Sequence, residues 1–105
     1  MNIVGIAACT AGIAHTYVAK EKLMKAAQKA GHNIHIETQG TIGTKDKIPD
    51  EKIINADVVI IAADVKVAGK ERFLGKKVIE VPTETVIRAP NKLIKRVEEL
   101  LAQQD

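Results

Sequence analysis

Residues 3–16 decide the fold: an apolar run, Ile3–Ala8 (IVGIAA), passes directly into Cys9–Thr16 (CTAGIAHT), where small and polar residues begin a helical period. A continuously apolar run of this length is typical of a strand covered on both faces of a parallel sheet. The loop after such a strand leaves the carboxyl edge of the sheet, and the next helix directs its unpaired N–H groups to the same place. We therefore expect the only cysteine of the chain to lie where a thiolate or a phosphate is stabilised.

Four segments have the length and composition of strands. The second alternates between apolar and polar residues, which is typical of a half-covered strand, and the third is apolar throughout. The expected strands are 3–8, 34–38, 58–62 and 78–81. Residues 39–50 contain two glycines and a proline and are expected to form a loop.

Helical periods fill the connections between these strands. Residues 13–30 have one apolar face, with lysines elsewhere, and the glycine that follows them is expected to end the helix. A short helix capped by Asp50 is expected through Asn55, and a last helix is expected to begin at Pro90 or Asn91. The apolar face of the first helix comprises Thr16, Ala19, Leu23, Ala26, Ala27 and Ala30.

The order βαβαβαβα predicts an α/β fold with one domain over residues 1–105. Right-handed crossovers would give an open four-stranded parallel sheet in the order 2-1-3-4, a Rossmann-like three-layer sandwich with helices on both faces. In such a sheet Glu37–Gly40 and Ala62–Asp64 end at the carboxyl edge beside Cys9.

Composition excludes several function classes. The net charge is +3, but the lysines alternate with acidic residues, and Tyr17 and Phe73 are the only aromatic residues, so a nucleic-acid surface is not expected. A single cysteine allows no internal disulfide, which indicates a reducing compartment. With no signal peptide and no apolar run long enough to cross a bilayer, we expect a soluble, cytoplasmic protein.

The residues after Cys9 suit the binding of a phosphoryl group. Ala11, Gly12 and Ala14 are small, so the backbone N–H groups of residues 10–16, Ile13 included, can turn inward around an anion. Thr10 and Thr16 add hydroxyl donors, and His15 can donate to an anion or stabilise a thiolate. Cys9 is therefore the candidate nucleophile.

Three chemistries compete for this thiol. Redox exchange would require a resolving cysteine, which the chain lacks. Cysteine phosphatases carry an arginine six residues after the nucleophile, where this chain has His15, and the arginines of the chain are remote in sequence. This favours a phosphocysteine that waits for another acceptor. A low-molecular-weight phosphatase or arsenate reductase, and a binding module with Cys9 merely packed, are the alternatives.

Several motifs together resemble the fructose-type enzyme IIB component of the bacterial sugar phosphotransferase system. The resemblance covers nearly the whole chain. It rests on Cys9, Gly12–Tyr17, Ile36–Gly40, Ile42–Gly43, Ala56–Asp64 and Glu71–Phe73. The family usually has Cys-Pro-Thr-Gly at the first of these motifs, whereas this chain has Thr10 and Ala11 between its cysteine and its glycine.

The resemblance implies a function and partners. Cys9 would take a phosphoryl group from a phosphohistidine of the IIA component, and the loop from Thr10 to Thr16 would hold it. A sugar, most commonly fructose in this family, would then receive the group as it passes through the membrane-embedded IIC component. We expect a monomer with these two partners, docked at the inner face of the membrane when it meets IIC.

Other titratable residues are assigned structural roles. Cys9, His15, His32 and His35 match no zinc-binding spacing, so neither a metal nor a cofactor is expected. Glu37 and Asp64 are interpreted as strand-end residues that hydrogen-bond the backbone, since phosphoryl transfer between carriers needs little acid–base catalysis.

Overall fold

The computed structural model describes residues 1–9, 13–40 and 43–103, apart from the side chains of residues 13 and 14. The loop positions Thr10, Ala11 and Gly12 therefore lie outside the described residues. The elements in chain order are β1 (Asn2–Ala8), α1 (Ile13–Lys29), β2 (Asn33–Gly40), β3 (Gly43–Lys45), α2 (Asp50–Ile54), β4 (Val58–Ala63), η1 (Lys70–Phe73), β5 (Val78–Val81), α3 (Thr83–Arg88) and α4 (Pro90–Ala102).

Within the described residues, the sheet has five strands in the order β3-β2-β1-β4-β5. β1 pairs in parallel with β2 and β4, and β4 pairs in parallel with β5. The predicted order 2-1-3-4 is thus confirmed for the four parallel strands. Since β1 is central, its last residue lies between the carboxyl ends of two neighbours.

The prediction of four strands, with a loop over residues 39–50, was wrong at one edge. β2 continues to Gly40, and the chain returns as the short antiparallel strand β3, in which Gly43 has φ 105°. Glycine adopts that left-handed conformation without strain. All three residues of β3 are exposed, so no apolar alternation marked them as a strand.

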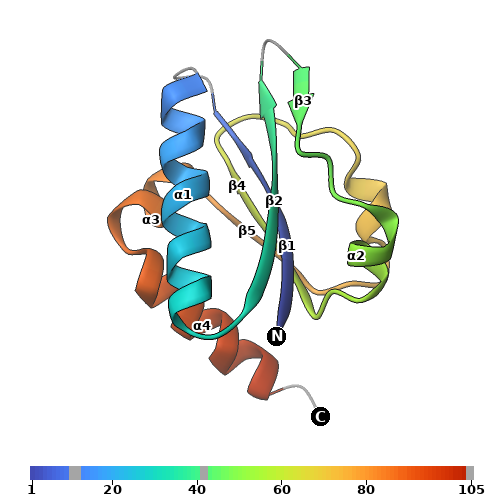
Figure 1. Ribbon diagram of the computed structural model, residues 1–105, viewed down its shortest axis with the longest axis vertical. Helices are drawn as coiled ribbons and strands as arrows, with labels where there is room; N and C mark the ends of the chain where they lie inside the picture. The colour runs from blue at the N-terminus through green and yellow to red at the C-terminus, as the bar shows by residue number, and fades with distance from the viewer. Residues whose placement is uncertain (10–12, 41–42, 104–105) are drawn as a thin grey trace.

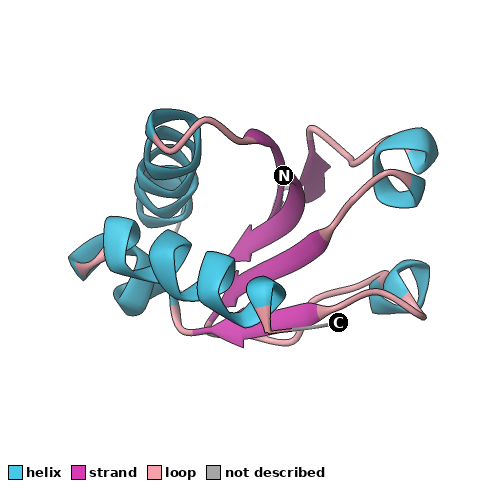
Figure 2. Cartoon of the chain, turned by 90° about the horizontal axis from the view of Figure 1, so that it is seen from below, coloured by secondary structure: helices cyan, strands magenta, loops and turns pink. Residues whose placement is uncertain are grey.

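Helices cover both faces of the sheet (Figures 1 and 2). On one side α1, α3 and α4 pack on a core that includes Leu23, Ile60 and Val97. On the other side α2 and η1 lie over a second core that includes Ile6, Ile61 and Phe73. This is the predicted three-layer α/β arrangement. In the described part of the chain, no helix is both long and apolar enough to span a membrane.

The helix α1 forms as its pattern predicts, with one correction at its end. The predicted apolar face is buried from Thr16 to Ala27, but Ala30 is exposed because the helix ends at Lys29. The N–H of Gly31 donates to the carbonyl of Gln28, and the N–H of His32 donates to that of Ala27. Gly31 has φ 87°, so this is a Schellman end with glycine in the left-handed conformation.

Two smaller features of the sequence were assigned differently. Pro49, rather than Asp50, is the N-cap residue of α2, and no side chain caps the helix. The six-residue helix α3 was not predicted, because Pro82 and Pro90 enclose too few residues for a visible period. Val86 of α3 is nevertheless fully buried.

Candidate functional site

Cys9 directly follows β1 at the carboxyl edge of the sheet, where the start of α1 also lies (Figure 1). Cys9 is 9% exposed, and its Sγ lies 3.2 Å from the hydroxyl of Thr16, a residue that is itself buried. The predicted juxtaposition of the thiol with the first turns of α1 is therefore present. Ile13 and Ala14 contribute the first backbone groups of that helix.

The carboxyl end of β4 adds a carboxylate to the same edge. The N–H of Asp64 donates to the carbonyl of Ala8 at 3.0 Å, which brings Asp64 next to the residue before Cys9. The carboxylate of Asp64 accepts hydrogen bonds from the N–H of Thr83 at 3.0 Å and from its hydroxyl at 2.5 Å. The expectation that Asp64 bonds the backbone is thus confirmed.

Thr83 joins this carboxylate to the histidine of α1. The hydroxyl of Thr83 lies 3.4 Å from Nε2 of His15. Thr83 is 1% exposed. One donor atom from each of Cys9, His15 and Asp64 lies within 4.8 Å of the others. The fold therefore gathers a thiol, an imidazole and a carboxylate from three elements.

The ionisation of Asp64 follows from its contacts. Hydrogen bonds from the hydroxyl and then the N–H of Thr83, helped by the charge of His15, hold the pKa of Asp64 below its ordinary value of 3.8. Asp64 is therefore a carboxylate at neutral pH and accepts hydrogen bonds rather than supplying a proton.

Glu37 makes structural contacts rather than catalytic ones. It is 1% exposed, its carboxylate accepts bonds from Nη1 and Nη2 of Arg72 at 2.9 and 3.1 Å, and the N–H of Ile48 donates to it at 3.1 Å. Burial alone would raise its pKa, but the bonds from Arg72, Gln39 and Ile48 outweigh burial and lower the pKa below 4.5. The predicted bond to backbone is confirmed, whereas the sequence did not indicate Arg72 as a partner.

The arginines contact groups other than Cys9 or lie on the exposed surface. Arg72 also lies over the ring of Phe73, 5.0 Å from its centroid. Arg88 pairs with Glu84 on the exposed surface of α3, and Arg96 lies on the exposed side of α4. In the sequence, His15 occupies the position six residues after Cys9 at which a cysteine phosphatase has its arginine.

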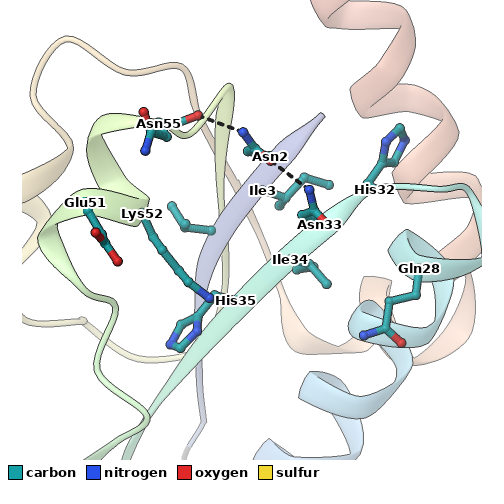
Figure 3. Close-up of a pocket in the computed structure, with 11 residues that line it drawn as sticks. Asn2, Ile3, Gln28, His32, Asn33, Ile34, His35, Glu51, Lys52 and Asn55 are labelled. Carbon is teal, nitrogen blue, oxygen red and sulfur yellow. Dashed lines mark hydrogen bonds between the residues drawn. The ribbon is translucent and has the colours of Figure 1, made fainter.

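A hollow in the described surface lies at the opposite edge of the sheet from Cys9. A pocket of about 430 Å³ opens at the amino ends of β1 and β2, the far end of strands about 20 Å long. Figure 3 shows Asn2 between Asn55 and Asn33, to which it is hydrogen-bonded. His32 and His35 line this pocket, so they are not brought to Cys9 and His15. The residues that line this pocket include no cysteine, so the thiol chemistry of the chain lies at the other edge.

Thr83 is the residue of this site that the sequence analysis missed. It follows the last strand and Pro82, so it emerges at the same carboxyl edge as Cys9 and Asp64. Its position just after a predicted strand is the feature of the sequence that could have indicated a place in the site.

Comparisons with known proteins agree on a family. The family model for the PTS system, lactose/cellobiose specific IIB subunit, matches residues 4–96. The "PTS system fructose-like EIIB component 2" of Escherichia coli K12 is 36% identical over 102 residues, which cover 97% of this chain and 96% of the relative. The "PTS system fructose-specific EIIABC component" of Bacillus subtilis is 42% identical over 95 residues, which cover 90% of this chain and 15% of that longer protein.

Solved structures give the same result. The enzyme IIB subunit of the PTS system from Escherichia coli K12 superposes with a TM-score of 0.91 at 32% identity, covering 98% of this chain and 95% of that one. A thioredoxin-dependent arsenate reductase of Corynebacterium glutamicum superposes with a TM-score of 0.51 at 14% identity, covering 98% of this chain and 62% of that one. The latter likeness shows a shared fold alone.

Proposed function

The chain belongs to the IIB components of the bacterial sugar phosphotransferase system, which are phosphotransferases, and we propose that Cys9 is the residue that carries its phosphoryl group. The observation that carries this proposal is the thiol of Cys9 at the end of the central strand, 3.2 Å from Thr16 in the first turns of α1. Unpaired N–H groups and a partial positive charge at that helix end favour both a thiolate and a phosphate.

The transfer consists of two displacements. The thiolate of Cys9 attacks the phosphorus of a phosphohistidine on the IIA component, so that an S–P bond forms as the P–N bond breaks. A sugar hydroxyl oxygen then attacks the same phosphorus, the S–P bond breaks, and the thiolate is restored as the hydroxyl proton is released. The phosphoryl group adds about −1.5 to −2 charges at neutral pH. We assign the stabilisation of that charge to residues 10–16, with His15 and Thr16 as the described side chains.

The partners follow from this cycle. A IIA component supplies the group, and a IIC component presents the sugar that accepts it. Among the relatives, the EIIABC name describes a protein in which such components are joined in one chain. We propose that this chain meets both partners at the carboxyl edge, since one sulfur must face each in turn.

Fructose is the proposed sugar. Relatives named as fructose-like or fructose-specific match nearly the whole chain at 36–46% identity. The family model is described by lactose and cellobiose instead. The fructose-like relative of Escherichia coli K12 supports this choice, because the match covers 97% of this chain and 96% of that relative. A transfer assay tests this choice. The phosphorylated protein is added to membranes that contain a fructose-type IIC, and phosphoryl transfer to fructose is compared with transfer to cellobiose.

The role of Cys9 is tested by phosphorylation. Incubation of the full chain with phosphoenolpyruvate, the general phosphotransferase proteins and a fructose-type IIA protein is expected to add the mass of one phosphoryl group. Cys9→Ser is expected to add none, whereas His35→Asn, a change at a histidine that bonds the carbonyl of Asp46, is expected to add one. Equal phosphorylation of the Cys9→Ser protein would disprove the proposal.

Hydrolysis distinguishes the enzyme alternatives. A phosphatase or an arsenate reductase would turn over an aryl phosphate or arsenate, whereas a carrier holds its phosphoryl group until the acceptor arrives. We expect no sustained release of phosphate from p-nitrophenyl phosphate, because the bidentate arginine that such hydrolysis uses is replaced by His15. Sustained release would favour the hydrolase.

A further inference from the structure

Three chemically different metal donors meet at the carboxyl edge of the sheet. Cys9 follows β1, His15 lies in the first turn of α1, and Asp64 follows β4. Their donor atoms lie within 4.8 Å of one another, within the part of the chain that the structure describes. We propose that these three residues form a binding site for Zn²⁺, which captures the same sulfur that we assign to phosphoryl transfer.

The geometry is close to that of a zinc centre. Zinc–ligand distances of about 2.0–2.3 Å in a tetrahedral site separate the donor atoms by roughly 3.3–3.6 Å. Donor atoms that lie up to 4.8 Å apart therefore need to converge by up to about 1.2–1.5 Å. Asp64 is exposed and His15 is partly exposed, so their side chains have room for that adjustment. Three protein ligands leave a fourth position for water, as in other open zinc sites.

A second layer of hydrogen bonds orients the ligands. Thr83 holds the carboxylate of Asp64 with both its N–H and its hydroxyl, and Thr16 contacts the sulfur of Cys9. Thr16 and Thr83 are 6% and 1% exposed, so their positions are set by the core. Metal sites depend on such outer partners to hold the ligands in place.

The same bonds select the tautomer of His15. Because the hydroxyl hydrogen of Thr83 is donated to Asp64, its oxygen can only accept from Nε2–H of His15. In that tautomer Nδ1 carries the lone pair that a metal requires. Metal-binding histidines commonly donate their other N–H in this way. Zn²⁺ binding displaces the thiol proton to solvent and involves no change of oxidation state.

The donor set selects the metal. A thiolate excludes the hard cations Mg²⁺ and Ca²⁺, and the mixture of sulfur, nitrogen and oxygen donors suits Zn²⁺. Metal and phosphoryl group cannot occupy one sulfur together. The proposal goes beyond the proposed function, because metal binding needs neither donor nor sugar.

Co²⁺ serves as the spectroscopic probe for Zn²⁺ in the reduced full-length protein. We expect one Co²⁺ per chain, with a thiolate-to-cobalt band in the near ultraviolet and the strong visible bands of a four-coordinate ion, all lost when Zn²⁺ is added. His15→Asn and Asp64→Asn are each expected to weaken binding by at least about 10–100-fold. Cys9→Ser is expected to remove the ultraviolet band. His35→Asn and Asp50→Asn make the same chemical changes elsewhere and are expected to leave binding unchanged.

The results distinguish a metal site formed by three residues from metal binding by the thiol of Cys9 alone. Circular dichroism establishes that each variant is folded. If only Cys9→Ser weakens binding, the thiol alone captures the metal and the proposal is overturned; it is also overturned if wild-type protein binds no Co²⁺.

Alkylation provides a second measurement that is independent of phosphoryl transfer. Zn²⁺ is expected to protect Cys9 from iodoacetamide in the wild-type protein, and a chelator is expected to restore alkylation. Protection that persists undiminished in Asp64→Asn would contradict the site. A protein that binds metal but is not phosphorylated would disprove the proposed function alone. A protein that is phosphorylated but binds no metal would disprove the metal site alone.

Discussion

Charged residues of this protein differ in how much their ion pairs contribute to the stability of the fold. Arg72 and Glu37 form a two-pronged ion pair in which Glu37 is 1% exposed, whereas the Arg88–Glu84 pair lies on the surface. A buried carboxylate that loses its partner keeps its desolvation cost without compensation. An exposed pair contributes little, because water replaces each partner.

Arg72→Met is therefore expected to lower the free energy of unfolding by about 3–5 kcal/mol. The matched change Arg88→Met is expected to lower it by less than about 1 kcal/mol. Urea unfolding followed by circular dichroism measures both. Equal losses in the two variants would show that the Glu37–Arg72 pair is not the stabilising contact that its burial indicates.

The lowered pKa of Glu37 also predicts a pH dependence. Because the folded protein binds this proton less readily than the unfolded chain, the stability from Glu37 is present above about pH 4.5 and disappears as the pH falls through the lower folded-state pKa. The stability difference between wild type and Glu37→Gln is expected to be constant from pH 7 to 5 and to shrink below 4.5. Urea unfolding at pH 7, 5 and 3 tests this, and a difference that grows on acidification would contradict it.

Among the elements, β1 depends on a close approach to β4. A Cβ atom on Gly5 would lie 2.2 Å from the carbonyl oxygen of Ile60, which is backbone and cannot swing aside. Gly40 in β2 would place a Cβ in open space. The central strand therefore requires glycine for contact between backbones, not for a turn.

Gly5→Ala is expected to destabilise the protein by about 3 kcal/mol, at the upper end of ordinary overpacking. Gly40→Ala, the same change one strand away, is expected to alter stability by less than about 1 kcal/mol. Thermal unfolding by calorimetry compares the two. A Gly5→Ala protein as stable as the Gly40→Ala protein would mean that β1 and β4 can separate without cost.

At the scale of the whole molecule, the proposed chemistry and the pocket lined by Asn2 lie at opposite edges of the sheet. Cys9, Asp64 and Thr83 lie at the carboxyl edge, and the pocket lined by Asn2 and Asn33 lies at the amino edge. A charge added to Cys9 therefore acts first on groups at its own edge, since electrostatic effects weaken with distance and salt.

Phosphorylation is accordingly expected to shift the amide resonances of His15, Thr16, Asp64 and Thr83. The amides of Asn2 and Asn33 are expected to stay unchanged. Comparison of ¹⁵N–¹H spectra before and after phosphorylation measures this. Shifts centred on the amino edge would indicate that the modified site, or a coupled movement, lies there instead.

The features that could be predicted from the sequence are those with a short-range cause. The period of residues 13–30 predicted α1 because apolar side chains three and four residues apart share one face of a helix. The position of Cys9 at the strand-to-helix junction followed in the same way. The strand β3 was not predicted because its three exposed residues carry no apolar period.

By itself the sequence determined the α/β order, the four parallel strands, α1 and the place of the single cysteine, since each depends on neighbours along the chain. Only the tertiary structure decided which distant side chains meet. Arg72 reaches Glu37 across 35 positions, and Thr83 reaches His15 across 68. Such pairs depend on strand order and on the paths of the crossovers, which bring the carboxyl ends of β1, β4 and β5 together whatever their separation in sequence.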